Sequence, residues 1–107
     1  MVVKTTEQTR NVTLTIGNAA QVEVCPSREG SQVLILERTI SNNSTGGQII
    51  SLAYNAEAVA GQGIVLQPAA CRVEAYDGHY RPTLTNLNAI SSAAGGSLSV
   101  FERIVGV

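Results

Sequence analysis

Short runs in which apolar and polar residues alternate, separated by turn residues, make up most of this 107-residue chain. Residues 10–16 read RNVTLTI, so that the valine, leucine and isoleucine share one side and the threonines the other. A period of two is typical of a half-buried β-strand. Gly17 and Asn18 then mark a turn into residues 20–24, which repeat the alternation. We therefore expect these two runs to form a β-hairpin.

The longest run, residues 32–41, differs from the others in its first half. Val33 to Leu36 place apolar side chains at four successive positions, which indicates a strand covered on both faces. Glu37 and Arg38 follow, and we expect both charged side chains to be solvated. Leu36 is then expected in the core, where its replacement by alanine costs about 2–5 kcal/mol.

Five further short runs have the same character and are bounded by turn residues. We expect strands over residues 48–54, 64–66, 71–76, 87–91 and 97–105. Eight short strands without an amphipathic helix predict an all-β fold, either an antiparallel β-sandwich or a jelly-roll-like barrel. Residues 9–107 are expected to form a single β domain that follows a flexible N-terminal arm, residues 1–8. Exposed strand edges such as residues 10–16 or 97–105 could pair with the sheet of a neighbour.

Charged residues make up only 14% of the chain, whereas Ser, Thr, Asn and Gln supply 31 of its residues. A soluble domain usually has about a quarter of charged residues, so this surface is polar but weakly charged. Such a surface is common where much of the outside is buried in an assembly, although a plain β-rich domain can look the same. The net charge of −1 and the seven scattered Lys and Arg residues argue against nucleic-acid binding. No apolar run is long enough to span a membrane, and the first ten residues lack the apolar stretch of a signal peptide.

Few residues offer reactive chemistry. His79 is the only histidine, and nothing in the spacing pairs it with a nucleophile such as Cys71. The eight acidic residues form no site-like cluster, and the glycines lack the ending of a phosphate-binding loop. Cys25 and Cys71 match no zinc pattern, and the sequence leaves open whether they form a disulfide. We expect no enzymatic activity, no metal and no cofactor.

One loop is denser in contact-forming residues than the rest of the chain. Tyr76, His79, Tyr80 and Arg81 lie within six positions of each other, beside the turn signal of Asp77 and Gly78. Aromatic and arginine side chains are enriched in protein interfaces and serve sugar-binding surfaces. These four residues are the candidate partner contacts, although the tyrosines could equally close the end of a sandwich.

The second half of the chain resembles small structural proteins of tailed bacteriophages. The resemblance begins at GIVLQP, residues 63–68, and continues to the loop at Tyr80. It resumes at NAIS, residues 88–91, and AAGG, residues 93–96, and it ends at LSV, residues 98–100, before Glu102 and Arg103. The first half fits more loosely, with a Thr-rich opening strand, a long strand at 33–40 and an Asn-rich turn.

This resemblance implies a non-enzymatic virion protein that is assembled in the host cytoplasm and binds the major capsid protein or other virion proteins. A capsid decoration protein, which clamps neighbouring capsid subunits, is the first expectation. Self-association is expected as well, first as a trimer, because such shells have threefold axes. The alternative is a carbohydrate- or receptor-binding module of a head or tail fibre that uses the loop at residues 77–81.

Overall fold

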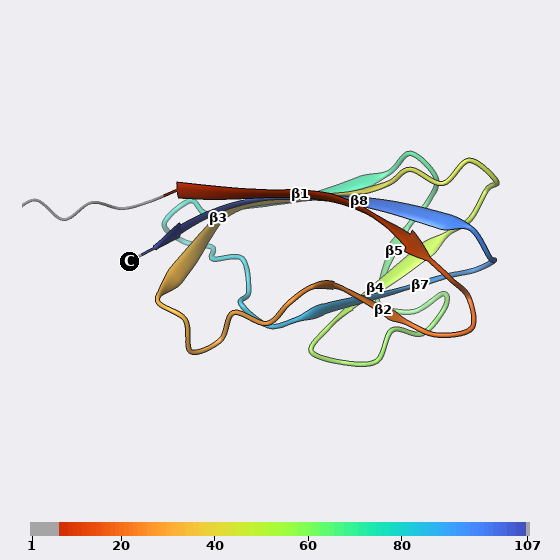
Figure 1. Ribbon diagram of the computed structural model, residues 1–107, viewed down its shortest axis with the longest axis horizontal. Helices are drawn as coiled ribbons and strands as arrows, with labels where there is room; N and C mark the ends of the chain where they lie inside the picture. The colour runs from red at the N-terminus through yellow and green to blue at the C-terminus, as the bar shows by residue number, and fades with distance from the viewer. Residues whose placement is uncertain (1–6, 107) are drawn as a thin grey trace, which may run out of the picture.

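The computed structural model describes residues 7–106, which form eight β-strands in two antiparallel sheets packed face to face (Figure 1). The first sheet, called the long sheet, contains in spatial order β1 (Glu7–Ile16), β8 (Gly96–Gly106), β3 (Val33–Asn42) and β6 (Cys71–Ala75). The second, called the short sheet, contains β2 (Val22–Cys25), β7 (Leu87–Ser91), β4 (Ile50–Tyr54) and β5 (Ile64–Leu66). The described residues contain no helix, so none is long and apolar enough to cross a membrane.

The strand order is that of a jelly roll. The chain crosses between the sheets at every connection except β4 to β5, which are neighbours in the short sheet. Two interleaved four-stranded antiparallel sheets of this kind form the double Greek key of jelly-roll domains. The prediction of an all-β sandwich or jelly-roll-like barrel is confirmed. Each predicted strand run overlaps one observed strand, and their ends differ by three residues or fewer.

The predicted hairpin between residues 10–16 and 20–24 is wrong. β1 pairs with β8 along its whole length, and β2 pairs with β7 in the other sheet. The turn after Ile16 therefore carries the chain across the sandwich instead of reversing it within one sheet. Alternation along a strand shows which side chains face inward, but it does not determine which strand is the neighbour.

The prediction that Glu37 and Arg38 are both solvated is also wrong, because Arg38 is fully buried. The pairing of β3 with β8 shifts between Ile35 and Glu37, so Leu36 is an extra residue that forms a β-bulge. A bulge moves all later side chains by one position relative to the alternation. As a result Arg38 points into the sandwich, and Leu36 is only partly buried instead of belonging to the core.

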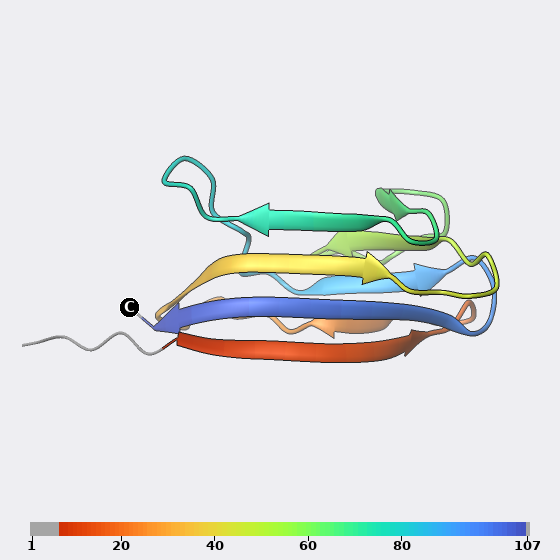
Figure 2. The ribbon, with the colours of Figure 1, turned by 90° about the horizontal axis from the view of Figure 1, so that it is seen from above.

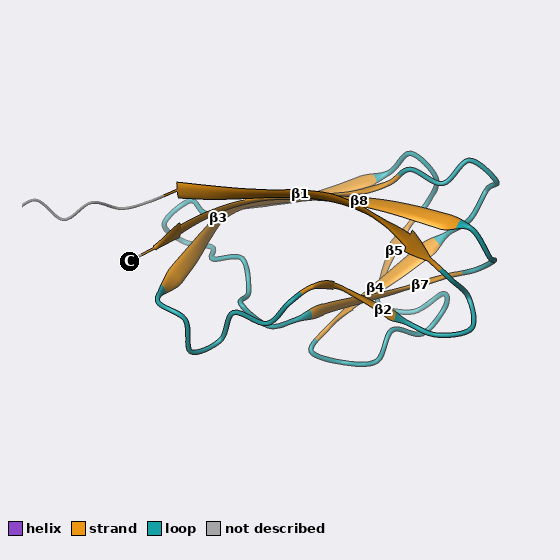
Figure 3. Ribbon diagram, in the orientation of Figure 1, coloured by secondary structure: helices purple, strands orange, loops and turns teal. Residues whose placement is uncertain are grey.

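The hydrophobic core lies between the short sheet and the facing half of the long sheet. It is almost wholly aliphatic and consists of Ile16, Val24, Cys25, Ile40, Ile50, Leu52, Leu66, Leu87, Ala89, Leu98 and Val100. Beyond the short sheet, the inner face of the long sheet is covered by loops, as Figure 3 shows. These are the β2–β3 loop, residues 26–32, and the β6–β7 loop, residues 76–86, which are joined by a hydrogen bond from Arg28 N to Leu84 O of 2.7 Å.

Two further expectations concern the N-terminus and the cysteines. Of the predicted arm, residues 1–8, Glu7 and Gln8 belong to β1, and residues 1–6 lie outside the described part of the chain. Cys25 is buried on the short sheet and Cys71 is exposed on the long sheet, and both are free thiols. The cysteines therefore do not form a disulfide with each other.

Candidate functional site

The four predicted contact residues lie together on the β6–β7 loop, which projects beyond the end of β6 (Figure 2). Tyr76 and Tyr80 are 39% and 42% exposed, and His79 and Arg81 are exposed as well. The tyrosines therefore do not close the end of the sandwich. We call these four residues the contact loop.

The contact loop is held in shape by Asp77. Its Oδ1 accepts hydrogen bonds from the backbone N–H groups of His79 and Tyr80, at 2.9 and 2.7 Å. These two bonds lower the pKa of the Asp77 carboxyl from its ordinary value. Asp77 therefore stabilises the turn of the contact loop.

The structure does not bring His79 together with Cys71. Cys71 begins β6 and His79 follows the end of that strand, so the two residues lie at opposite ends of β6. The described residues also contain no cluster of three His, Cys, Asp or Glu side chains that could hold a metal ion. The loop can make contacts through its aromatic rings and its guanidinium group.

A buried ionic cluster, which the sequence did not predict, lies at the centre of the long sheet's inner face. Arg38 and Glu102 are both fully buried and are joined by hydrogen bonds from Arg38 Nε and Nη2 to Glu102 Oε2, at 3.1 and 2.9 Å. Arg38 Nη1 also lies 3.3 Å from Oε1 of the buried Glu74. One arginine therefore links two carboxylates from β6 and β8 inside the sandwich.

Partly buried residues complete the ionic cluster at its edges. Arg10 and Arg28 contact Glu102 Oε1 at 3.0 and 3.4 Å, and Arg72 contacts Glu74 at 2.9 Å. The hydroxyl of Tyr54, from the short sheet, donates a hydrogen bond to Glu74 Oε2. Each buried carboxylate thus has more than one cationic partner, as a charge removed from water requires.

The protonation states in the ionic cluster are fixed by burial and by these partners. Burial by itself raises the pKa of Glu102, but the charge of Arg38 and hydrogen bonds from Arg38 and Arg10 outweigh it and hold that pKa below its ordinary value. Burial raises the pKa of the neighbouring Cys25 thiol to about 11. Burial and the bond to Glu74 raise the pKa of Tyr54 to about 12. The carboxylate therefore stays ionised and the thiol stays protonated, so neither suits acid–base or nucleophilic catalysis near neutral pH.

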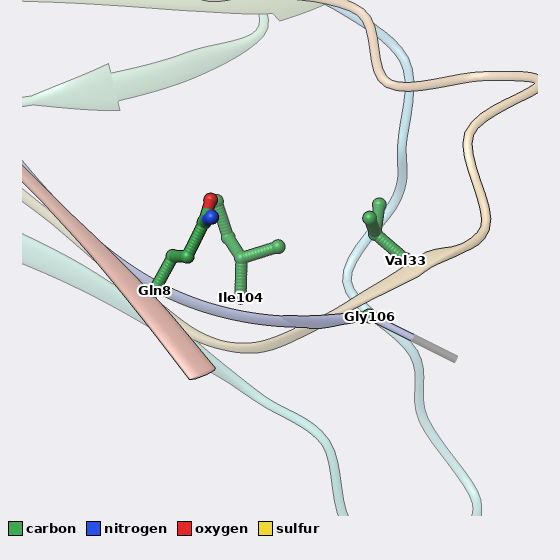
Figure 4. A pocket seen from close by; sticks show the side chains of 4 residues that line it. All are labelled: Gln8, Val33, Ile104 and Gly106. Atoms are coloured by element: carbon green, nitrogen blue, oxygen red, sulfur yellow. The ribbon is translucent and has the colours of Figure 1, made fainter. Parts of the chain in front are cut away.

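A hollow of about 150 Å³ lies beyond the ionic cluster, at the end of the long sheet (Figure 4). It is lined by Gln8 of β1, Val33 of β3, and Ile104 and Gly106 of β8. Gln8 and Ile104 are partners in the β1–β8 pairing, and their side chains lie next to each other. This lining offers one amide among apolar groups and no ionisable side chain.

The outer face of the long sheet carries a broad surface without charge, called the uncharged face. Strand pairing aligns its residues in three successive rows across the sheet. They are Asn11, Phe101, Thr39 and Val73; Thr13, Ser99, Ser41 and Cys71; and Thr15 and Ser97. Val73 is 60% exposed. At one end of this face, Arg103 forms ion pairs with both Glu7 and Glu37.

No model of a known protein family matches the sequence, and no curated protein matches it. Solved structures do resemble the fold. One is a subunit of the disulfide-linked pili that form Bacillus endospore appendages, with a TM-score of 0.58 and 11% identity over 96% of this chain and 88% of that chain. Another is the virus-like particle protein of extra small virus from the giant freshwater prawn Macrobrachium rosenbergii, with a TM-score of 0.54 and 12% identity over 98% and 80%.

A third similar structure is the acid-stable capsid of the Helicobacter pylori bacteriophage KHP30, with a TM-score of 0.49 and 11% identity over 97% of this chain and 92% of that chain. At identities this low, similarity concerns the arrangement of strands and not the activity. The chain is therefore similar in fold to proteins of pili and viral particles.

Proposed function

We propose that this chain is a non-enzymatic structural protein of a virion, and that it decorates the capsid of a tailed bacteriophage. It acts through contacts with its neighbours, across the joints between major capsid subunits. The observation that carries this proposal is the uncharged face, where ten aligned side chains from all four strands of one sheet carry no charge.

An uncharged, partly apolar face is suited to a protein contact. The centres of protein interfaces are depleted of charged residues, because each buried charge loses its hydration. Here Val73 and Phe101 supply apolar surface, and the surrounding Ser, Thr and Asn side chains supply hydrogen-bonding groups. Ordinary soluble surfaces are more densely charged, so such a face is consistent with burial in an assembly.

The fold and the sequence give further support. The protein of the extra small virus particle, which itself builds an assembly, is similar in fold to this chain. The run GIVLQP, residues 63–68, and the run from Asn88 to Arg103 resemble tailed-phage structural proteins. The two carboxylates of the ionic cluster are buried and paired with arginines, so the residues available at the surface are those of the contact loop and the uncharged face.

The mechanism follows from repetition. One contact through the uncharged face is modest by itself, but many copies around a shell each hold two capsid subunits together. Linked contacts of this kind add up to a large resistance against disassembly. Three copies around a threefold axis are the arrangement that we propose for the decorating unit.

The second candidate is a carbohydrate- or receptor-binding module of a fibre, for which the exposed contact loop is the supporting observation. Tyr76 and Tyr80 present aromatic rings beside Arg81, which are groups that sugars and proteins bind. This function would use the loop and not the uncharged face. Variants of the two surfaces therefore separate the candidates.

The experiment is a binding assay with capsids of the encoding phage that were prepared without this chain. The purified chain is expected to sediment with these capsids in a fixed ratio. Val73→Lys is expected to abolish co-sedimentation, because it places a charge in the contact. Val65→Lys is the matched control, since Val65 is an exposed valine of β5 in the other sheet.

Two outcomes would contradict the decoration role. In the first, the chain stays in the supernatant while the capsids sediment. In the second, it binds capsids equally well with and without the Val73→Lys change. Binding of the isolated chain to host cells or glycans, lost on replacement of Tyr76 and Tyr80 by alanine, would favour the fibre module instead.

A further inference from the structure

The edge strand β1 differs from the other sheet edges in the described part of the chain. It is ten residues long, and every residue from Glu7 to Ile16 pairs with β8 without a register shift. By contrast, β5 has three residues, β2 has four and a bulge, and β6 has five. Soluble proteins usually protect a long edge with proline, lysine, a bulge or an inward-pointing charge. β1 contains none of the first three, and its one inward charge, Arg10, is paired with Glu102 of the same subunit.

The free side of β1 exposes both backbone and apolar groups. In a strand paired on one side, every second residue directs its N–H and C=O groups outward. The side chains of Val12 and Leu14 face the core but stay partly exposed, whereas their β8 partners Val100 and Leu98 are fully buried. Val22 of β2 also packs against the core while partly exposed. A strand added beside β1 would satisfy the backbone groups and cover Val12 and Leu14.

We infer that this occupant is β1 of a second copy of the chain, paired antiparallel about a twofold axis at Val12. This inference deepens the proposed function by naming a self-association surface. In this register Val12 faces its own counterpart, and Thr9 and Asn11 face Thr15 and Thr13 of the partner. A threonine pair such as Thr9 with Thr15 is a favourable cross-strand neighbour, and the valine pair buries apolar surface.

Charge is compatible with this pairing. The two charged residues of β1 are both engaged within their own subunit, Glu7 with Arg103 and Arg10 with Glu102. The register places Arg10 opposite Leu14, so no like charges oppose each other. The uncharged face of each copy continues into that of the other, which doubles the width of the proposed capsid contact.

A single strand pair gives a small interface. Ten residues extend about 34 Å, and an interface one strand wide lies below the roughly 1,200 Å² of stable protein complexes. Isolated chains are therefore expected to associate weakly, and the contact becomes significant where capsid binding holds copies close together. Because it is twofold, it also suits the joint between subunits of neighbouring trimers.

The experiment is disulfide trapping with the purified full chain. Val12→Cys, combined with Cys71→Ser to remove the exposed thiol, places two thiols opposite each other at the twofold axis. Mild oxidation is expected to give a disulfide-linked dimer on a non-reducing gel. Thr15→Cys in the same background is the matched control, because the two copies of residue 15 are six positions, or about 20 Å, apart in this register.

A second pair of variants tests the same contact without cysteine at the axis. An equal mixture of Thr9→Cys and Thr15→Cys chains is expected to give the mixed dimer.

A charge test uses the Val12→Cys chain again. Asn11→Lys with Thr13→Lys opposes like charges across the edge, and it is expected to suppress cross-linking of Val12→Cys at least tenfold. Gln62→Lys with Gln67→Lys adds the same charge at exposed positions outside the strands and should leave cross-linking unchanged.

The results separate this inference from the proposed function. A monomeric Val12→Cys chain after oxidation, or equal cross-linking of the Thr15→Cys chain alone, would show that β1 does not pair in this way. Capsid co-sedimentation would be unaffected by that result. Sedimentation equilibrium of the unmodified chain gives an independent measure. Weak dimerisation that is abolished by Asn11→Lys with Thr13→Lys supports the pairing. Dimerisation that these two changes leave intact contradicts it.

Discussion

Arg38 and Glu102 are direct neighbours on β3 and β8, and both are fully buried, with Arg38 Nη2 lying 2.9 Å from Glu102 Oε2. A charge removed from water is stabilised only by close partners, and Arg38 also contacts Glu74. The two carboxylates join β3 to both of its neighbours in the long sheet. The ionic cluster therefore helps to fix the register of β3 against β6 and β8.

Removing one partner of this pair should strongly destabilise the protein. Glu102→Leu leaves Arg38 buried with one carboxylate, and we expect a loss of about 3–5 kcal/mol in the free energy of unfolding. Urea denaturation followed by circular dichroism measures this loss. The double change Arg38→Met with Glu102→Leu should cost clearly less than the sum of the two single changes. Additive losses would show that the two residues do not interact in the folded protein.

Stability should fall in acid because of Glu102. Its folded pKa lies below the ordinary value of 4.5, so its contribution is complete above that value and is lost as protonation begins in the folded state. Unfolding free energies measured from pH 7 downward should therefore decrease as the pH falls from about 5 toward 2. Glu102→Gln should flatten this dependence, whereas Asp77→Asn, at an exposed turn, should retain most of it. An unchanged slope in Glu102→Gln would contradict the assignment.

The bulge at Leu36 changes the expected cost of a core substitution. Leu36 is only partly buried, so Leu36→Ala should cost less than about 2 kcal/mol, below the range expected from the sequence. Ile40→Ala, on the same strand but fully buried in the core, should cost about 2–5 kcal/mol. Thermal and urea unfolding of the two variants make the comparison. A larger loss for Leu36→Ala than for Ile40→Ala would place the bulge elsewhere.

Gly63 should tolerate no side chain, for a reason beyond its backbone angle. Gly61 and Gly63 both have positive φ, of 80° and 75°, but only at Gly63 would an added Cβ lie 2.7 Å from the backbone oxygen of Leu52. Gly61→Ala should cost about 1–2 kcal/mol from backbone strain. Gly63→Ala adds the clash to the same backbone strain, so the free energy of unfolding of Gly63→Ala should be lower than that of Gly61→Ala. Equal losses in the two variants would refute the close approach.

The strand positions could be predicted from the sequence, because one period of two defines each strand and turn residues end it. The pairing of the strands could not be predicted in this way. The residues at the end of β1, at Ile16, would be the same whether the next strand paired with β1 or belonged to the facing sheet. The contact loop was also predictable as an exposed segment, because Asp77 and Gly78 mark a turn. Whether it binds a partner remains a prediction.

Part of the ionic cluster had a signal in the sequence that was missed. Arg10 has the same inward phase as Val12, and Glu102 has the same phase as Val100, so one charge of each sign falls on a buried side. Such a coincidence predicts an internal ion pair. The inward position of Arg38 was hidden, because the bulge at Leu36 reverses the phase and leaves no mark in the residue pattern.

The most direct test of the central claim, that this chain acts as a contact protein on a capsid, is a cryo-electron microscopy reconstruction of the encoding phage particle. The account predicts density for the sandwich on the outer capsid surface, with the uncharged face against the joints between major capsid subunits. Density for the chain only in tail or fibre positions, or on the capsid with the short sheet as its contact face, would contradict the account.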